Sequence, residues 1–302
     1  MRHDVNQEYI IYPPDNRRAD EWITALLAAG ITFRTTEVDG RCAIHVASND
    51  RVIATEEIAA YEADNLDWPP PGYREPAAVP APHGTWAHIG GVLLVAGWYA
   101  WLGPFRADSP VLAAAAAQSA GVLRGEWWRV VTALMTHAGI DHIVGNVLCL
   151  YLFARAVCRL LGGGVGWALI LASGILGNLL TALIFRTGHV SVGASTACFG
   201  AVGILCGCQA VRNLRRYGGV FSVWNRTWIP IGAGLCLLAL LGLGPNSDLA
   251  AHAFGFAAGI ALSIPIGYVD TQRLPPWLQP ALQLACLLIV LLSWRAAFLA
   301  AT

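Results

Sequence analysis

Long apolar stretches, separated by short polar or Gly- and Pro-containing gaps, fill most of the chain after residue 85. Each stretch is close to the roughly 20 residues that a helix needs to cross a hydrocarbon core of about 30 Å. We therefore expect seven membrane-spanning helices, near residues 86–104, 139–160, 165–185, 195–211, 228–243, 249–269 and 277–299. The fourth stretch is short and starts at Ser195, so we expect this end of the helix to lie below the membrane surface.

Residues 105–138 are too long for a turn and too mixed in polarity for a span. They contain an Ala-rich, helix-like stretch followed by the sequence GEWWR. We expect a structured loop that lies against the bilayer, with Trp127, Trp128 and Arg129 anchoring it at the level of the lipid headgroups.

The first part of the chain has a different periodicity. Strand-like segments at 8–12, 31–38 and 41–47 alternate with helix candidates at 19–29 and 49–65. Asp39-Gly40 between the second and third strands is a two-residue hairpin signal. The predicted order is β-α-β-β-α, typical of a small α/β domain.

Residues 67–85 are rich in Pro and predict a stiff, extended linker. The expected organisation is therefore a small cytosolic α/β domain at 1–66, a linker at 67–85 and a seven-span membrane domain at 86–302. The fold class is mainly α, a polytopic membrane helix bundle.

Composition agrees with a membrane protein, because 56% of the residues are hydrophobic and only 13% are charged, against about 25% charged in soluble domains. The zero net charge divides unevenly: residues 1–85 hold 7 Arg and 14 acids, and residues 86–302 hold 12 Arg and 5 acids. With the N-terminus in the cytoplasm, the basic cluster at 212–217 falls on the inner side, as positive charge prefers. We expect a bacterial inner membrane.

Polar and ionisable side chains inside a span are costly and mark candidate functional sites. His142 and Asn146 are four residues apart and share a helix face, Ser195 follows Gly193 at the start of the fourth span, and His252 lies four residues into the sixth. At 1.5 Å per residue, all four side chains fall within roughly 10 Å of the same end of their helices.

Small residues on the same helices favour a close approach between them. Gly255 and Gly259 on the sixth span and several Gly on the fourth allow two helix backbones to pack tightly. This approach would bring the Ser195 hydroxyl to a His252 nitrogen, where the imidazole can accept its proton and create a nucleophile. The Ser195 amide, Asn146 and His142 are candidate donors to an oxyanion. Asp248 is expected at the water interface, so the candidate catalytic group is a dyad.

The chain contains four motifs in a fixed order: GEWWR, H-x4-H-x3-N, G-x-S and A-H-x2-G-x3-G. Taken together, they resemble the motifs of the rhomboid intramembrane proteases, and the resemblance covers residues 86–270. The resemblance implies a Ser195–His252 dyad with an oxyanion hole formed by His142, Asn146 and the Ser195 amide. It also implies a six-helix core, to which the seventh span adds a C-terminal helix. Substrates would be single-span membrane proteins cut near the outer face.

Several other residues are expected to act in structural roles. Trp128 and Arg129 match the motif of the family's large first loop, and Phe199, where Tyr is frequent, can still stack on His252. His137 is expected to position a loop, and Asn178 to satisfy a neighbouring helix.

Two other functions fit parts of the pattern. One is a proteolytically inactive relative that binds transmembrane clients, although such relatives usually lack the Ser or the His. The other is a metal-binding or transport protein that uses His137, His142 and His252. Neither explains Gly193-x-Ser195 together with Asn146. We therefore expect no metal or other cofactor, and partners limited to the bilayer and transmembrane substrates, without nucleic acid.

Overall fold

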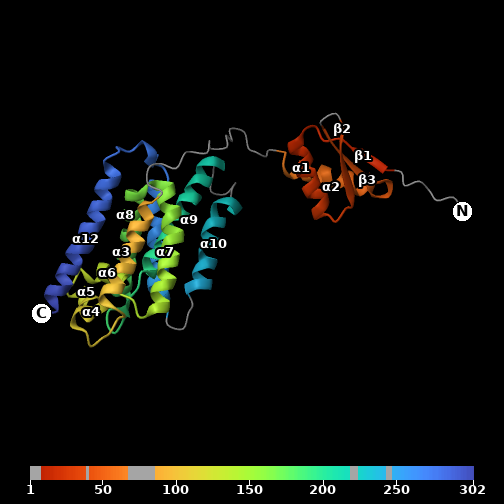
Figure 1. Cartoon of the computed structure of the whole chain (residues 1–302). Coiled ribbons are helices and arrows are strands. Elements are labelled where there is room, and N and C mark those ends of the chain that lie inside the picture. The colour runs from red at the N-terminus through yellow and green to blue at the C-terminus, as the bar shows by residue number, and fades with distance from the viewer. Residues whose placement is uncertain (1–7, 39–40, 67–85, 218–223, 243–246) are drawn as a thin grey trace. The chain divides into compact units, whose positions relative to one another are not determined.

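A computed structural model describes residues 8–38, 41–66, 86–217, 224–242 and 247–302 (Figure 1). The chain divides into two compact units, Met1–Glu75 and Pro76–Thr302. The predicted linker at 67–85 and the predicted turn at Asp39-Gly40 lie outside the described residues.

The N-terminal unit is a three-stranded antiparallel sheet with two helices. Its elements are β1 (Glu8–Ile11), α1 (Asn16–Ala28), β2 (Phe33–Val38), β3 (Arg41–Ala47), the 3-10 turn η1 (Ser48–Asp50) and α2 (Arg51–Asp64). The strand order is β1-β3-β2, and the predicted β-α-β-β-α succession is the observed one. The helix α1 begins before the predicted residue 19 because the Asp15 carboxylate accepts the Arg18 amide at 2.7 Å and caps it.

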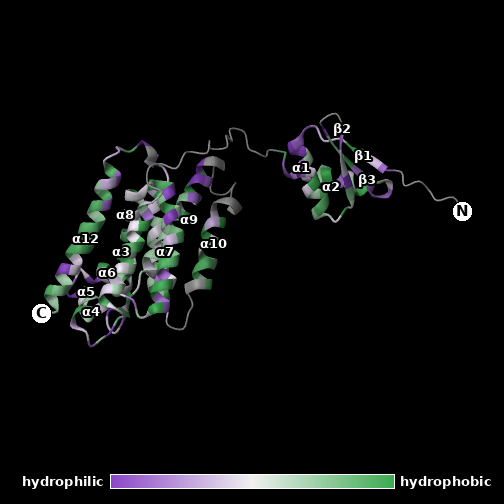
Figure 2. Ribbon diagram, in the orientation of Figure 1, coloured by the Kyte–Doolittle hydropathy of each residue, from purple (hydrophilic) through white to green (hydrophobic). Residues whose placement is uncertain are grey.

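The second unit is a bundle of apolar helices. They are α3 (Ala87–Leu102), α7 (Ile140–Leu161), α8 (Gly163–Phe185), α9 (Ser195–Tyr217), α10 (Trp224–Gly242), α11 (Leu249–Ile266) and α12 (Leu278–Ala300). Among the described residues, five of them are long and apolar enough to cross a membrane, and α3 and the Trp228–Leu240 part of α10 are shorter. Figure 2 shows hydrophobic residues along most of α3 and α12. The prediction of a polytopic membrane helix bundle is confirmed.

Three predicted helix ends are wrong by several residues. The helix α9 is not short: it spans 23 residues and ends at Tyr217, because the Leu and Arg residues at 212–217 are good helix formers. The helix α10 begins at Trp224 instead of 228, and α11 ends at Ile266 instead of 269, where Pro265 and Gly267 interrupt it.

The helix α9 is the centre of the bundle, since its span is 72% buried, more than any of the other four. It packs directly against α11 through glycines. A Cβ added to Gly255 would collide with the Thr196 carbonyl, and one added to Gly259 with the Gly200 carbonyl. The absence of these side chains lets the two backbones touch, as the sequence predicts.

Residues 105–138 form a folded loop at one end of the bundle (Figure 1). It contains α4 (Pro110–Ala115), β4 (Ala117–Gln118), α5 (Ser119–Leu123), α6 (Arg129–Thr132) and the 3-10 turn η2 (Ala133–Met135). The short strand β4 pairs antiparallel with β5 (Val190–Ser191), which lies in the segment that leads to α9. The loop is therefore tied to the backbone that precedes Ser195.

Candidate active site

A serine hydroxyl and an imidazole from different helices meet inside the bundle. Ser195 is the first residue of α9, and His252 lies in the first turn of α11. The Ser195 Oγ to His252 Nε2 distance is 2.7 Å. His252 is 5% exposed, and its ring lies against that of Phe199, with centroids 4.7 Å apart and planes tilted by 35°. A hydrogen bond of this length in a protected setting suits proton transfer.

The other ring nitrogen of His252 faces a hydroxyl. His252 Nδ1 lies 3.3 Å from Ser247 Oγ, just before α11. If Nδ1 donates its proton to this oxygen, Nε2 is left to accept the proton of Ser195. Sequence reasoning did not single out Ser247, because a Ser in a polar interhelical segment carries no distinctive signal.

The backbone before Ser195 is held by two hydrogen bonds. The Gly193 amide donates to the Ala133 carbonyl at 2.9 Å, and the Ala194 amide donates to His137 Nε2 at 3.2 Å. Gly193 has a φ of +119°, a conformation that glycine adopts without strain. The Ser195 amide follows directly, at the positive end of the α9 dipole.

His142 and Asn146 lie on α7 and face Gly193. A Cβ added to Gly193 would lie 2.5 Å from His142 Nε2 and 3.3 Å from Asn146 Nδ2. His142 Nδ1 accepts the Ala138 amide at 3.4 Å, which leaves the ring proton on Nε2. Two N–H donors therefore point at the space beside the Gly193–Ser195 backbone.

A contact made by the side-chain oxygen of Asn146 fixes the orientation of its amide group. The Cys198 thiol lies 3.9 Å from Asn146 Oδ1, so the NH₂ group points the other way. Asn146 is buried, and its Nδ2 has no hydrogen-bond partner among the described residues. A buried donor without an acceptor is unusual in a folded protein and is typical of a group held ready for a substrate oxygen.

His137 fixes the loop before Ser195 as a neutral imidazole. Its Nδ1 donates to the Met135 carbonyl at 3.3 Å, so Nε2 is free to accept the Ala194 amide. His137 is fully buried. Burial, reinforced by the nearby His142, lowers the pKa of His137 to about 4.

Protonation of His137 is expected to destabilise the fold. Its folded-state pKa lies below the unfolded value of about 6.5, so stability is full above pH 6.5 and falls as the pH drops toward about 4, by up to about 3 kcal/mol. His137→Gln keeps an acceptor for the Ala194 amide but does not titrate. We expect thermal unfolding in detergent to show a smaller loss of Tm between pH 7 and pH 5 in His137→Gln than in the unmodified chain. An equal loss in both proteins would contradict this role.

Asp248 caps α11 and connects it to the segment before α9. Its carboxylate accepts the Ala251 amide at 3.0 Å and lies 2.8 Å from His189 Nε2. Burial alone would raise the pKa of Asp248, but hydrogen bonds from the Ala251 amide, Ser191 and His189 outweigh it and hold the pKa below its usual range. Asp248 is half-buried, and its position at the water interface stays a prediction. Its carboxylate bonds to His189 and serves as the helix cap.

The His189–Asp248 pair is expected to hold the start of α11 against the segment that leads into α9. His189→Ala removes the pair and leaves the cap, whereas Asp248→Ala removes both and loses about 1 kcal/mol more from the cap. We expect Tm to fall by about 2–4 °C more in Asp248→Ala than in His189→Ala. Thermal unfolding of the two variants in one detergent checks this order, and a larger fall in His189→Ala would contradict it.

Trp128 and Arg129 bind carbonyls inside the folded loop. Arg129 is 8% exposed and donates to the Ala113 and Ala116 carbonyls at 2.7 and 2.9 Å, while its Nε pairs with Glu126. Trp128 Nε1 donates to the Ala114 carbonyl at 3.1 Å. The predicted headgroup anchoring is wrong for Arg129, because its guanidinium satisfies buried carbonyls at the end of α4 and does not reach the surface.

Asn178 connects the residue after Ser195 to the folded loop. Its Nδ2 donates to the Val130 carbonyl at 3.0 Å, and its Oδ1 accepts the Thr196 hydroxyl at 3.2 Å. Asn178 therefore satisfies neighbouring elements, as expected. The role of Thr196 was not predicted, because its partner is distant in sequence.

Comparisons with known proteins agree on one family. The profile described as Rhomboid domain matches residues 124–269. The chain is 34% identical over 143 residues to the rhomboid-family protein YdcA of Bacillus subtilis, covering 47% of this chain and 69% of that protein. It is 31% identical to the rhomboid protease GluP of the same organism, covering 54% of this chain and 32% of GluP. It is also 31% identical to rhomboid-like protease 3 of Toxoplasma gondii, with 50% and 55% covered. The chain, an integral multi-pass membrane protein, therefore belongs to the rhomboid family.

Proposed function

We propose that this chain is an intramembrane serine endopeptidase that cleaves transmembrane segments of other membrane proteins. The observation that carries the proposal is the 2.7 Å contact between Ser195 Oγ and His252 Nε2. It supplies a nucleophile and a base in one buried site, which is the minimum for acyl transfer.

In the proposed reaction, Ser195 Oγ attacks the scissile carbonyl carbon while His252 Nε2 takes the hydroxyl proton. The carbonyl oxygen becomes an oxyanion, and the C–N bond breaks as His252 returns the proton to the leaving amine. Water then attacks the acyl-enzyme ester, with His252 again as base, and releases the second product and free Ser195. Ser247 Oγ lies 3.3 Å from His252 Nδ1, so it can accept the proton of Nδ1 and orient the imidazole.

Three donors are proposed to stabilise the oxyanion. They are the Ser195 amide, the Asn146 NH₂ and the His142 Nε2–H. The last two border the face of Gly193, and the α9 dipole adds positive potential at the same point. Donors fixed in place before the reaction need no reorganisation during it, which makes them effective.

Removing the Asn146 donor is expected to slow the chemical step. We predict that Asn146→Ala lowers kcat by about 100-fold to 1000-fold, with a small effect on KM, because the interaction forms only in the transition state. Steady-state cleavage kinetics in detergent measure the two constants. Cys198→Ala, which removes only the thiol beside Asn146, is the control and should retain most activity. An unchanged kcat in Asn146→Ala would exclude Asn146 from the oxyanion hole.

The two alternatives receive less support. A client-binding inactive relative would not need Ser195 and His252 to be in hydrogen-bond contact. A metal site would need three ligands to converge, but His137 Nε2 holds the Ala194 amide. Within the described residues, no three His, Cys, Asp or Glu side chains are grouped to hold a metal ion.

We also propose a cytoplasmic N-terminus, with the Ser195 end of the bundle toward the outside of a bacterial inner membrane. The basic residues of α9, such as Arg212 and Arg215, lie at the opposite end of that helix from Ser195, where the positive-inside preference places the cytoplasm. Cleavage would then occur near the outer face of the membrane.

The test is cleavage of a model transmembrane substrate by the full chain in liposomes. We expect cleavage that continues in the presence of EDTA and stops in Ser195→Ala. Cleavage by Ser195→Ala at the original rate would overturn the proposal, and loss of cleavage with EDTA would favour the metal-dependent alternative.

A further inference from the structure

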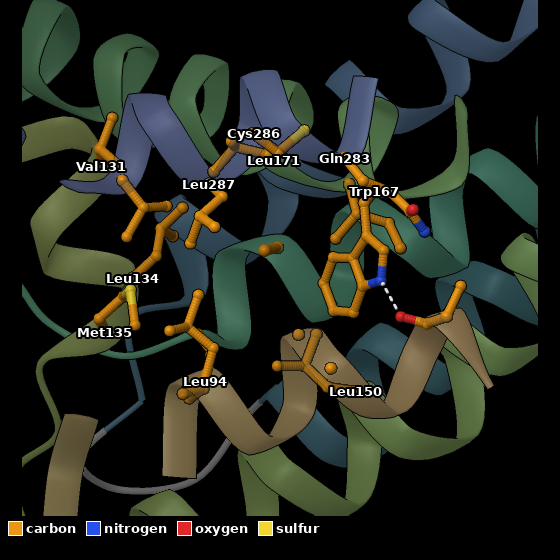
Figure 3. A pocket seen from close by; sticks show the side chains of 18 of the residues that line it. Leu94, Val131, Leu134, Met135, Leu150, Trp167, Leu171, Gln283, Cys286 and Leu287 are labelled. Carbon is orange, nitrogen blue, oxygen red and sulfur yellow. Dashed lines mark hydrogen bonds between the residues drawn. The ribbon is translucent and has the colours of Figure 1, made fainter. Parts of the chain in front are cut away.

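An apolar cavity of about 470 Å³ lies between α3, α8 and α12 (Figure 3). Leu94 on α3, Leu171 on α8 and Leu287 on α12 line its walls, and Leu134 and Met135 of the folded loop line one end. All three helices are among the apolar helices of the bundle. The cavity therefore lies at membrane depth, and neither Ser195 nor His252 lines it.

Aromatic side chains of α3 and α12 pack together beyond one end of the cavity, and the other end, toward Gly90, borders open space. Trp98 and Trp101 of α3 contact Trp294 and Phe298 of α12, with ring centroids 5.3 and 5.8 Å apart. Toward the start of α3, the Trp167 ring of α8 packs against Gly91, and the neighbouring Gly90 borders open space. A Cβ added to Gly90 would meet nothing within 4 Å.

The open end carries the polar groups of the cavity. Gln283 lies there beside Trp167, whose Nε1 donates to the Ala87 carbonyl at 2.9 Å (Figure 3). Trp86, at the same end, is 76% exposed. Exposed Trp beside a polar side chain is typical of the boundary between the hydrocarbon core and the headgroups, and this boundary is the one away from Ser195.

We propose that this cavity binds one acyl chain of a membrane phospholipid, with the headgroup beside Gln283 and Trp86. The lining of α3 from Trp86 to Val95 corresponds to about 14 Å along the helix axis. A volume of 470 Å³ over that length gives a mean width of at least about 6–7 Å, which is wide enough for an alkyl chain. Apolar walls with one polar end match the amphipathic chemistry of a lipid.

The far end of the bound acyl chain would contact residues that flank the candidate nucleophile. Ala194 and Ala197, which flank Ser195 in sequence, both line the cavity. The lipid site itself does not depend on the proposed function, so failure of the protease assignment would leave it standing. Its test accordingly measures binding and not cleavage.

The test uses the full chain in phosphatidylethanolamine and phosphatidylglycerol vesicles that contain a phospholipid with a photoactivatable diazirine in its acyl chain. After irradiation, peptide mass spectrometry measures the adducts at each residue. We expect adducts at Leu94 and Leu287, which line the cavity, to exceed those at their neighbours Leu93 and Leu288, which do not, by at least about fivefold, because a chain bound in the cavity stays longer beside its walls than a passing lipid does.

Two paired variants test the same site. Gly90→Phe places a ring inside the cavity, because Gly90 lines it. Gly97→Phe is the control: Gly97 is on the same helix and also has room for a side chain, but it does not line the cavity. We expect the Leu94 and Leu287 adducts to fall at least about fivefold in Gly90→Phe and to persist in Gly97→Phe. Leu287→Phe with Leu288→Phe as control repeats the comparison from α12, should Gly90→Phe not fold. Any of three results would overturn the proposal. They are equal labelling of Leu93 and Leu94, adducts that neither Gly90→Phe nor Leu287→Phe changes, and a crosslink through the cavity to a second copy of the protein.

Discussion

Replacing His252 with Ala is expected to reduce the rate of substrate cleavage by about ten-thousand-fold or more. Its Nε2 is 2.7 Å from Ser195 Oγ, and without a base at that distance the hydroxyl keeps its proton and remains a weak nucleophile. Initial rates of transmembrane substrate cleavage in detergent, at equal concentrations of folded protein, measure the effect.

Ser247→Ala is the matched control for His252→Ala. Ser247 Oγ contacts the other nitrogen of the same ring at 3.3 Å, so its loss disturbs the orientation of the imidazole but leaves the base in place. We expect Ser247→Ala to lose less than about tenfold, the scale of a single neutral hydrogen bond of about 1 kcal/mol. A His252→Ala protein that keeps more than about a tenth of the rate would show that the imidazole is not the base.

Gly193→Ala is expected to have the second largest effect, a loss of at least about 100-fold in kcat. The new methyl group would lie 2.5 Å from His142 Nε2 and 3.3 Å from Asn146 Nδ2, where the substrate oxyanion is proposed to lie. The φ of +119° also strains any residue with a Cβ. The same steady-state assay measures kcat, and near-UV circular dichroism verifies the fold.

Gly188→Ala separates these two causes. Gly188 precedes β5 in the same connection, has a φ of +78°, and a Cβ there would meet nothing within 4 Å. Its substitution introduces backbone strain of about 1–3 kcal/mol without blocking a donor. We expect Gly188→Ala to lower Tm and to retain kcat. Equal losses of kcat in Gly188→Ala and Gly193→Ala would mean that loop strain, and not the blocked space, explains the effect.

The helices were predictable because length and hydrophobicity alone define them. Each of the seven predicted stretches corresponds to one helix from α3 to α12, and the errors lie at ends such as residues 212–217, where polar residues continue the helix. The division into 1–66, 67–85 and 86–302 stays a prediction. The interior of residues 105–138 was not predictable in detail, since its short helices are held by side-chain bonds to carbonyls, such as those of Arg129, and leave no periodic pattern.

The candidate site was predictable where polar residues lie inside apolar helices. Ser195, His252, His142 and Asn146 stand out because the bilayer makes such residues costly, and counting along each helix gave their common depth. His189 and Ser247 carry no comparable signal, because polar residues between helices are ordinary. Only the three-dimensional structure brings His189 to Asp248 and Ser247 to His252.

The central claim is that His252 activates the Ser195 hydroxyl, and covalent labelling tests it most directly. A fluorophosphonate reacts with an activated serine, and peptide mass spectrometry identifies the modified residue. We predict one adduct on Ser195 in the unmodified chain, none in Ser195→Ala, and a labelling rate at least about 100-fold slower in His252→Ala. No adduct on Ser195 in the folded protein, or an unchanged rate in His252→Ala, would contradict the claim.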